Sequence, residues 1–208
     1  MSVGDIEDTL GDNGYEFDIF LSYRRSGRGN ACQWVHNHFY PLLLDCLTDQ
    51  VGWEPRIFID LAAETGSDWP SLLEDALLRS KMLVAVWSPP YFRSAWCLAE
   101  WESMQARERA LNLGQPSRPN GLIYPIIFSD SDNFPPAALR RQARDLKPWS
   151  NPFLAYRESH GYDALYREMQ DIAIEIGQML TRAPIWRPGW PIHRPDHPTA
   201  GSPGLADL

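Results

Sequence analysis

The sequence predicts an α/β domain built on a parallel, doubly wound sheet. Short apolar runs typical of buried strands alternate along most of the chain with segments whose apolar residues recur at threes and fours, as on helices. Such alternation favours parallel strands with helices on both faces. With 208 residues, of which 44% are hydrophobic and 12% aromatic, the chain is long enough for one sizeable core.

The predicted strands are four apolar runs and a weaker fifth. They cover residues 17–23, 56–60, 82–87, 122–128 and 152–156. Each is short and nearly continuous in apolar residues, as expected of a strand covered on both faces. Pro125 weakens the fourth run as an interior strand, because proline has no N–H to donate to a neighbouring strand.

Helical spacing marks four segments between and after these runs. They cover residues 34–47, 69–77, 97–104 and 162–180. Pro41 predicts a kink or a restart within the first helix. Pro70, close behind Ser67 and Asp68, marks the start of the second. The last segment has the clearest pattern and closes the domain.

The composition divides the chain into an acidic arm at 1–14, the domain at 15–182 and a Pro-rich tail at 183–208. The prolines of the tail block regular structure. Trp186 and Trp190 are unusual in a free linker, and they suggest that residues 185–190 pack on the domain or on a partner. An unstructured end is the alternative interpretation.

The net charge and the positions of the cysteines argue against several classes of protein. A net charge of -8 and a pI of about 5.1 oppose binding to nucleic acid or to an anionic membrane surface. Cys32, Cys46 and Cys97 lie in apolar stretches rather than in paired turns, which indicates reduced thiols. We find neither a secretion signal nor a stretch able to span a bilayer, so we expect a cytoplasmic protein.

Ligands of an open parallel sheet bind beyond the carboxyl ends of its strands. This rule nominates Ser22, Tyr23 and Arg24 after the first strand, Asp60 after the second and Trp87 after the third. The Gly27 and Gly29 turn lacks the third glycine of a dinucleotide fingerprint and a phosphate-loop lysine, so we interpret it as a mobile turn. Its neighbours Arg24, Arg25 and Arg28 could still meet phosphates. No histidine or cysteine spacing predicts a metal site or a hydrolase triad.

The segment 94–100, Ser-Ala-Trp-Cys-Leu-Ala-Glu, opens the helix after the third strand. Together with the first strand ending in Ser22 and Tyr23, and with the loop and helix of residues 66–80, it resembles TIR (Toll/interleukin-1 receptor) domains, especially prokaryotic NAD-cleaving ones. The resemblance covers about residues 15–180, and the Trp-Cys-x-x-Glu box is its specific part.

The resemblance implies a flavodoxin-like three-layer fold with a five-stranded parallel sheet. It also implies cleavage of the nicotinamide–ribose bond of NAD⁺, which is a substrate here and not a bound cofactor. Glu100 falls on the family's catalytic glutamate and Trp96 on the aromatic residue four positions earlier, a spacing that puts both on one helix face. From spacing alone, Glu100 would be a solvated surface residue and Trp96 a core residue.

Two functions remain open at this point. The first is an NAD⁺ nucleosidase or cyclase yielding nicotinamide and ADP-ribose or a cyclic isomer, with Ser22, Tyr23, Arg24, Asp60 and Trp87 as further substrate contacts. The second is a non-catalytic adaptor that acts by homotypic assembly through loop 61–69. The family further implies assembly-dependent activation, an antiviral defence role and a companion defence protein. The sequence does not decide the product, the trigger or the oligomeric form.

Overall fold

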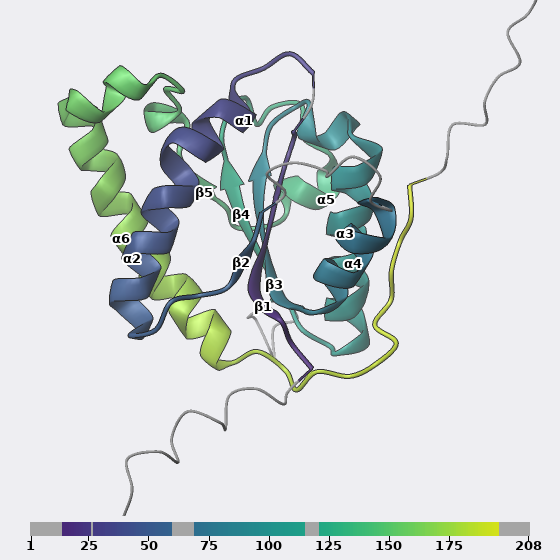
Figure 1. The fold of residues 1–208 in the computed structure, drawn as a ribbon. Coiled ribbons are helices and arrows are strands. Elements are labelled where there is room, and N and C mark those ends of the chain that lie inside the picture. The colour runs from purple at the N-terminus through teal and green to yellow at the C-terminus, as the bar shows by residue number, and fades with distance from the viewer. Residues whose placement is uncertain (1–13, 26, 60–68, 115–120, 196–208) are drawn as a thin grey trace, which may run out of the picture.

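The computed structural model describes residues 14–25, 27–59, 69–114 and 121–195. This part of the chain contains a five-stranded parallel sheet in the order β2-β1-β3-β4-β5 (Figure 1). The strands are β1 (Phe17–Tyr23), β2 (Ile57–Phe58), β3 (Ser80–Trp87), β4 (Ile123–Ile127) and β5 (Arg144–Asp145). The order is that of flavodoxin-like folds. The predicted fold class is therefore confirmed.

Helices cover both faces of the sheet (Figure 1). One layer contains α1 (Ala31–Trp34), a π-helical segment η1 (Val35–Phe39), α2 (Tyr40–Val51) and α6 (His160–Thr181). The other contains α3 (Trp69–Leu78), α4 (Ala95–Ala110) and α5 (Pro136–Leu139). Short 3₁₀ turns, η2 (Tyr91–Arg93), η3 (Lys147–Trp149) and η4 (Leu154–Glu158), join the elements.

The alternation of side chains along β1 divides the core between the two layers. Ile19, Leu21 and Tyr23 pack under the α1, α2 and α6 layer, whereas Phe20 packs under the α3 and α4 layer. Successive residues of a strand point to opposite faces. Ser22 therefore points to the same layer as Phe20, the layer that carries α4.

The first helical segment continues through Pro41 with a change of geometry. The π-helical turn of η1 ends at Phe39, and α2 begins at Tyr40 with Pro41 in its first turn. Proline lacks the N–H that an interior helical position needs, and a widened turn before it accommodates this. The predicted restart at Pro41 is confirmed.

Pro125 lies in the middle of β4, opposite Ala85 of β3. Leu122 and Phe128 of this segment exchange backbone hydrogen bonds with β3, whereas Ile127 accepts one from Leu146 on the other side. Residues of odd number thus point towards β5, and β5 pairs only from Ile126 onward. The missing N–H of Pro125 falls where β5 has not begun, which is why an interior strand tolerates it.

The location predicted for the fifth strand is wrong. Residues 154–158 form the 3₁₀ turn η4, and Phe153 and Leu154 are 63% and 58% exposed. The fifth strand is instead β5, which has only two residues, both polar. A two-residue edge strand has no apolar run to reveal it.

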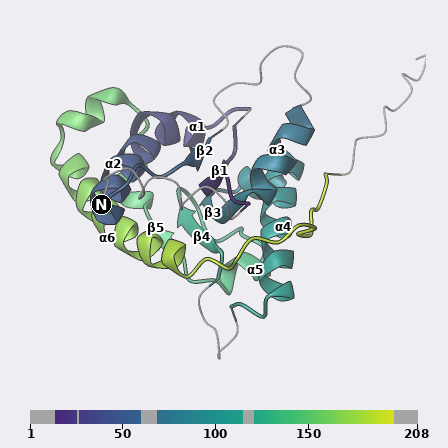
Figure 2. The same ribbon diagram turned by 60° about the horizontal axis from the view of Figure 1, so that its bottom comes forward.

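The C-terminal segment 184–195, here called the strap, crosses the outer side of the α3 and α4 layer (Figures 1 and 2). Trp186 Nε1 donates to the carbonyl of Leu78 at 3.3 Å. The Trp190 ring is 8% exposed and lies 5.1 Å from the guanidinium carbon of Arg107, a cation–π contact. Of the alternatives left open by the sequence for residues 185–190, packing on the domain is the one observed, through Trp186 and Trp190.

Polar contacts fasten the end of the strap to both helices of this layer. The backbone N–H of His193 donates to Ser103 Oγ of α4 at 2.8 Å. Arg194 forms two hydrogen bonds of 2.8 Å with Glu74 of α3. The strap therefore bridges α3 and α4. No helix within the described ranges has the length and apolar character needed to cross a membrane.

Candidate functional site

The carboxylate of Glu100 lies in the second turn of α4 and is 6% exposed. The helix begins after Ser94, whose Oγ accepts from the N–H of Cys97 at 3.4 Å, a normal N-cap arrangement. The Cys97 thiol points back to β1 and donates to the carbonyl of Tyr23 at 3.5 Å. This start directs Glu100 against the end of β1. It is not the solvated surface carboxylate that its spacing alone suggests.

One hydroxyl group donates to the Glu100 carboxylate, and a second lies behind it. Ser22, 2% exposed at the end of β1, donates from Oγ to Glu100 Oε2 at 2.5 Å. Ser22 Oγ also lies 2.9 Å from the hydroxyl of Tyr91, whose side chain is fully buried. Three oxygens from β1, η2 and α4 thus form one hydrogen-bonded chain.

Burial sets the charge state of Glu100. Loss of solvation raises the pKa of the Glu100 carboxyl to about 7, against the lowering effects of the Ser22 hydrogen bond and the Arg25 charge. Both protonation states are therefore populated near neutral pH. A carboxyl group poised in this way can act as an ion, a base or an acid.

Glu100 also lines a small cavity of about 10 Å³ beside β1. The other lining residues are Phe20, Leu21, Tyr23, Arg25, Phe58 and Leu73. Such a volume is near the minimum for one water molecule. The Tyr23 hydroxyl points to the opposite layer, 2.8 Å from His36 Nε2. Nothing as large as nicotinamide fits this cavity in the present conformation.

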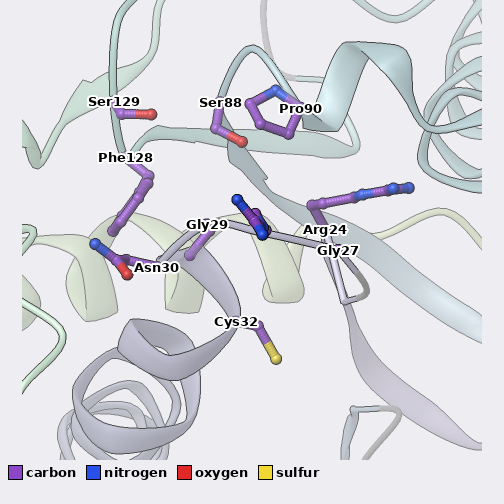
Figure 3. A pocket seen from close by; sticks show the side chains of 11 residues that line it. Arg24, Gly27, Gly29, Asn30, Cys32, Ser88, Pro90, Phe128 and Ser129 are labelled. Carbon is purple, nitrogen blue, oxygen red and sulfur yellow. The ribbon is translucent and has the colours of Figure 1, made fainter.

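A larger cavity of about 260 Å³ opens beyond the carboxyl ends of β1, β3 and β4. Its lining consists of Arg24, Gly27, Arg28, Gly29, Asn30, Ala31, Cys32, Ser88, Pro90, Phe128 and Ser129. Figure 3 shows Ser88 and Pro90 on one side and Gly29 and Asn30 on the other. The cavity lies where the strand order reverses between β1 and β3, the usual ligand position in such sheets.

The glycine-containing turn forms one wall of this larger cavity. Gly27 and Gly29 have φ values of +92° and +137°, a region that glycine enters without steric cost. The turn leads directly into α1, whose first residues Ala31 and Cys32 also line the cavity. Its interpretation as a turn, rather than as a dinucleotide fingerprint, agrees with this geometry.

The structure brings together only part of the predicted site. Ser22, Tyr23 and Glu100 meet at the end of β1, and Arg24 lines the larger cavity next to them. Trp96 is half-buried and packs on the core under α3 and α4. Asp60 and the loop residues 61–68 lie outside the described residues, and Trp69 is the first residue of α3.

Trp87 is placed in the core. It is 1% exposed and its ring contacts Phe92, Trp101 and Phe134. It lines neither of the two cavities described above. A substrate contact by Trp87 stays a prediction that this packing does not support.

Glu102 confirms the direction of α4. It is exposed, and its carboxylate lies 3.7 Å from His193 of the strap. Two residues along a helix point to different sides, so Glu102 is a natural control for Glu100. Within the described residues no group of three or more His, Cys, Asp or Glu side chains could hold a metal ion.

Sequence reasoning did not single out Tyr91. Tyr91 lies in η2, before α4, whereas the residues that the sequence predicts for the site, Trp96 and Glu100, lie within α4. Two sequence features point towards the contact between Tyr91 and Ser22. Side chains alternate along β1, which turns Ser22 towards α4, and only a short segment links β3 to α4. These features predict which layer meets Ser22 but not which side chain.

Comparison with known proteins gives one family. The family model described as TIR domain matches residues 19–158. The TIR domain of the Toll-related receptor TRR-2 from Hydra magnipapillata is similar at 16% identity, over 74% of this chain and 98% of that chain, with a TM-score of 0.43. The TIR domains of the activated Roq1 resistosome, which directly recognizes the pathogen effector XopQ, are similar at 20% identity, over 80% and 82%, with a TM-score of 0.37. No curated protein matches this chain.

Proposed function

The chain belongs to the TIR domain family, and we propose that it is an enzyme that cleaves NAD⁺ at the bond between nicotinamide and ribose. The observation that carries the proposal is the buried Glu100 carboxylate at the carboxyl end of the sheet, held by Ser22 and with a pKa of about 7. A domain that acts only through its surface gains nothing from a buried carboxylate that titrates near neutral pH. An enzyme can use such a group in its reaction.

The chemistry needs one anionic group at the ribose. When the C–N bond breaks, its electron pair goes to the nicotinamide nitrogen, so the leaving group departs neutral and needs no proton. Positive charge develops on the ribose, as in other glycosyl transfers. The ionised Glu100 carboxylate stabilises this charge in a site of low polarity, where such stabilisation is strongest.

The second half of the reaction decides the product. Water attacking the ribose gives ADP-ribose and releases one proton, which the Glu100 carboxylate accepts as a general base. Attack by a group of the adenosine part gives a cyclic isomer instead. Both routes share the first step and the same carboxylate.

The rest of NAD⁺ finds suitable groups in the larger cavity. A volume of about 260 Å³ is below the roughly 300–1,000 Å³ of common ligand pockets, so it suits a part of NAD⁺. We assign the pyrophosphate to Arg24, whose guanidinium can donate two charge-assisted hydrogen bonds. Ser22 holds the Glu100 carboxylate, and Tyr23 lines the small cavity beside it. In this proposal Trp96 stacks on a base of NAD⁺, and Asp60 and Trp87 are further substrate contacts.

A non-catalytic adaptor is the second candidate, and one observation favours it. The cavity that Glu100 lines among the described residues is only about 10 Å³, so the carboxylate is closed to substrate here. Catalysis therefore requires an opening, and we propose that self-association through loop 61–69 supplies it. In this proposal the protein is a cytoplasmic, assembly-activated antiviral effector or signal generator that acts with a companion defence protein.

Nicotinamide release separates the two candidates. Purified protein is incubated with NAD⁺, both in solution and clustered on beads, beside Glu100→Gln and Glu102→Gln, and the nucleotide product is identified by mass. We expect release from the wild type and from Glu102→Gln and none from Glu100→Gln. No release from clustered wild type would favour the adaptor, and equal release from Glu100→Gln would exclude the proposed chemistry.

A further inference from the structure

We infer that Tyr91 is a positioning residue, which fixes the Ser22 hydroxyl so that its proton points to Glu100. The inference deepens the proposed function and depends on it only where catalysis is measured. Tyr91 acts on the carboxylate through Ser22, because its hydroxyl lies next to Ser22 Oγ and Ser22 donates to Glu100. The three groups come from three different elements, β1, η2 and α4.

A count of protons gives the direction of each hydrogen bond. Ser22 has one hydroxyl proton, and at 2.5 Å it is donated to Glu100 Oε2. The 2.9 Å contact between Ser22 Oγ and the Tyr91 hydroxyl must then use the proton of Tyr91. When Glu100 is ionised, Tyr91 donates to Ser22 and Ser22 donates to Glu100. Chained hydrogen bonds of this kind strengthen each other.

Tyr91 is well fixed for this role. Its backbone N–H donates to the carbonyl of Ser88 at 2.9 Å, and its ring meets Phe92 edge to face with the centroids 5.2 Å apart. Burial raises the pKa of the Tyr91 hydroxyl well above its usual value, so the hydroxyl keeps its proton. It is a permanent donor and cannot itself serve as the acid or base of the reaction.

The groups that face Glu100 come from β1 and the residues directly after it, from η2 and from its own helix. Arg25 lowers the pKa of the Glu100 carboxyl by its charge. The charges of ionised Tyr23, Tyr91 and Cys97 would repel the carboxylate, but burial raises the pKa of each of these groups, so they stay neutral. Near neutral pH the carboxylate therefore depends on Arg25 and on the hydrogen-bonded chain to offset its burial.

The test replaces only the hydroxyl of Tyr91. In Tyr91→Phe the pKa of the Glu100 carboxyl is measured by ¹³C NMR, with Glu100→Gln used to identify the signal. Tyr124→Phe is the matched control, because it removes another hydroxyl that donates to a carboxylate, that of Glu175 at 2.5 Å, on the opposite face of the sheet. Nicotinamide release is then measured against pH for the same variants.

We expect Tyr91→Phe to raise the pKa of Glu100 by about one unit, the effect of weakening one charge-assisted hydrogen bond. The ionised fraction at pH 7 then falls from about one half to about one tenth, so release falls about five-fold at pH 7 and recovers near pH 9. Tyr124→Phe changes neither quantity.

Two outcomes overturn the inference. One is an unchanged Glu100 pKa in Tyr91→Phe, and the other is a loss of release that is equal at every pH, which would indicate packing alone. If the pKa rises but no variant, nor the wild type, releases nicotinamide, the positioning role stands and the proposed function fails. The NMR arm thus separates the two claims.

Discussion

Replacing Glu100 by glutamine is expected to stabilise the fold, and to do so increasingly as the pH rises. Burial raises the pKa of the Glu100 carboxyl from 4.5 to about 7. A group whose folded pKa is raised above its unfolded value favours the folded state only while it is protonated. The stability of the wild type therefore falls as the pH rises from about 4.5 through 7. Glutamine has a similar shape, accepts from Ser22 through its carbonyl and never ionises.

The size of the effect follows from the two pKa values. Each unit of pKa difference corresponds to about 1.4 kcal/mol. The carboxylate costs the wild type about 1 kcal/mol at pH 5, where it is about three-quarters ionised in the unfolded chain and almost wholly protonated in the folded protein, and about 3 kcal/mol at pH 8. The advantage of Glu100→Gln in the free energy of unfolding should therefore grow by about 2 kcal/mol over this range.

Urea unfolding followed by tryptophan fluorescence at pH 5, 6, 7 and 8 measures this difference. Glu102→Gln is the control, since it removes an exposed carboxylate of the same helix and should show no such trend. A difference between Glu100→Gln and wild type that stays constant from pH 5 to 8 would refute the reasoning. It would mean that Glu100 is solvated or fully paired in the folded protein.

Three further predictions concern the larger cavity, the strap and assembly. Arg24→Ala should lower kcat/KM for NAD⁺ by roughly 10- to 100-fold, mainly through KM, because a charged hydrogen bond to phosphate is worth about 1.5–3 kcal/mol; unchanged steady-state kinetics would remove Arg24 from the site. Trp190→Ala should lower the free energy of unfolding by about 3 kcal/mol, measured by urea unfolding. Arg194→Ala removes an exposed ion pair and should leave urea unfolding unchanged. Equal losses in the two variants would contradict this ranking. Nicotinamide release per subunit should rise with protein concentration or on clustering, and a constant specific activity would contradict assembly dependence.

The sheet shows where sequence patterns inform and where they fail. The runs that became β1, β3 and β4 are buried on both faces, so their composition alone indicates strands. The strand β5 is a strand because it pairs with β4: Arg144 and Asp145 lie opposite Ile126 and Ile127. Two polar residues carry no sequence pattern that predicts this pairing. Phe153 to Tyr156 has the composition of a strand, but in the described part of the chain it leads into the turn η4 and pairs with no strand. Strand formation is partly a property of what lies alongside.

The sequence predicts some features of the candidate site and not others. The position of Glu100 on α4 and the gathering of Ser22, Tyr23 and Arg24 at one edge follow from strand order and helix spacing. Burial of Glu100 does not follow, because a glutamate in a helical pattern is usually solvated. The core position of Trp87 is equally hidden, since a residue at a strand end can point to ligand or to core.

The strap has a consequence for the order of folding. Its tryptophans dock on surfaces made by other segments. Trp186 reaches the end of α3, and it leaves no room for a side chain at Gly14, because a Cβ there would lie 2.3 Å from the ring. Those surfaces exist only after β1, α3 and α4 have assembled. The contacts of the strap join it to segments far away in the sequence, so the long intervening chain must already be closed for them to form. We therefore expect the strap to dock late in folding, after the sheet and the α3 and α4 layer have formed.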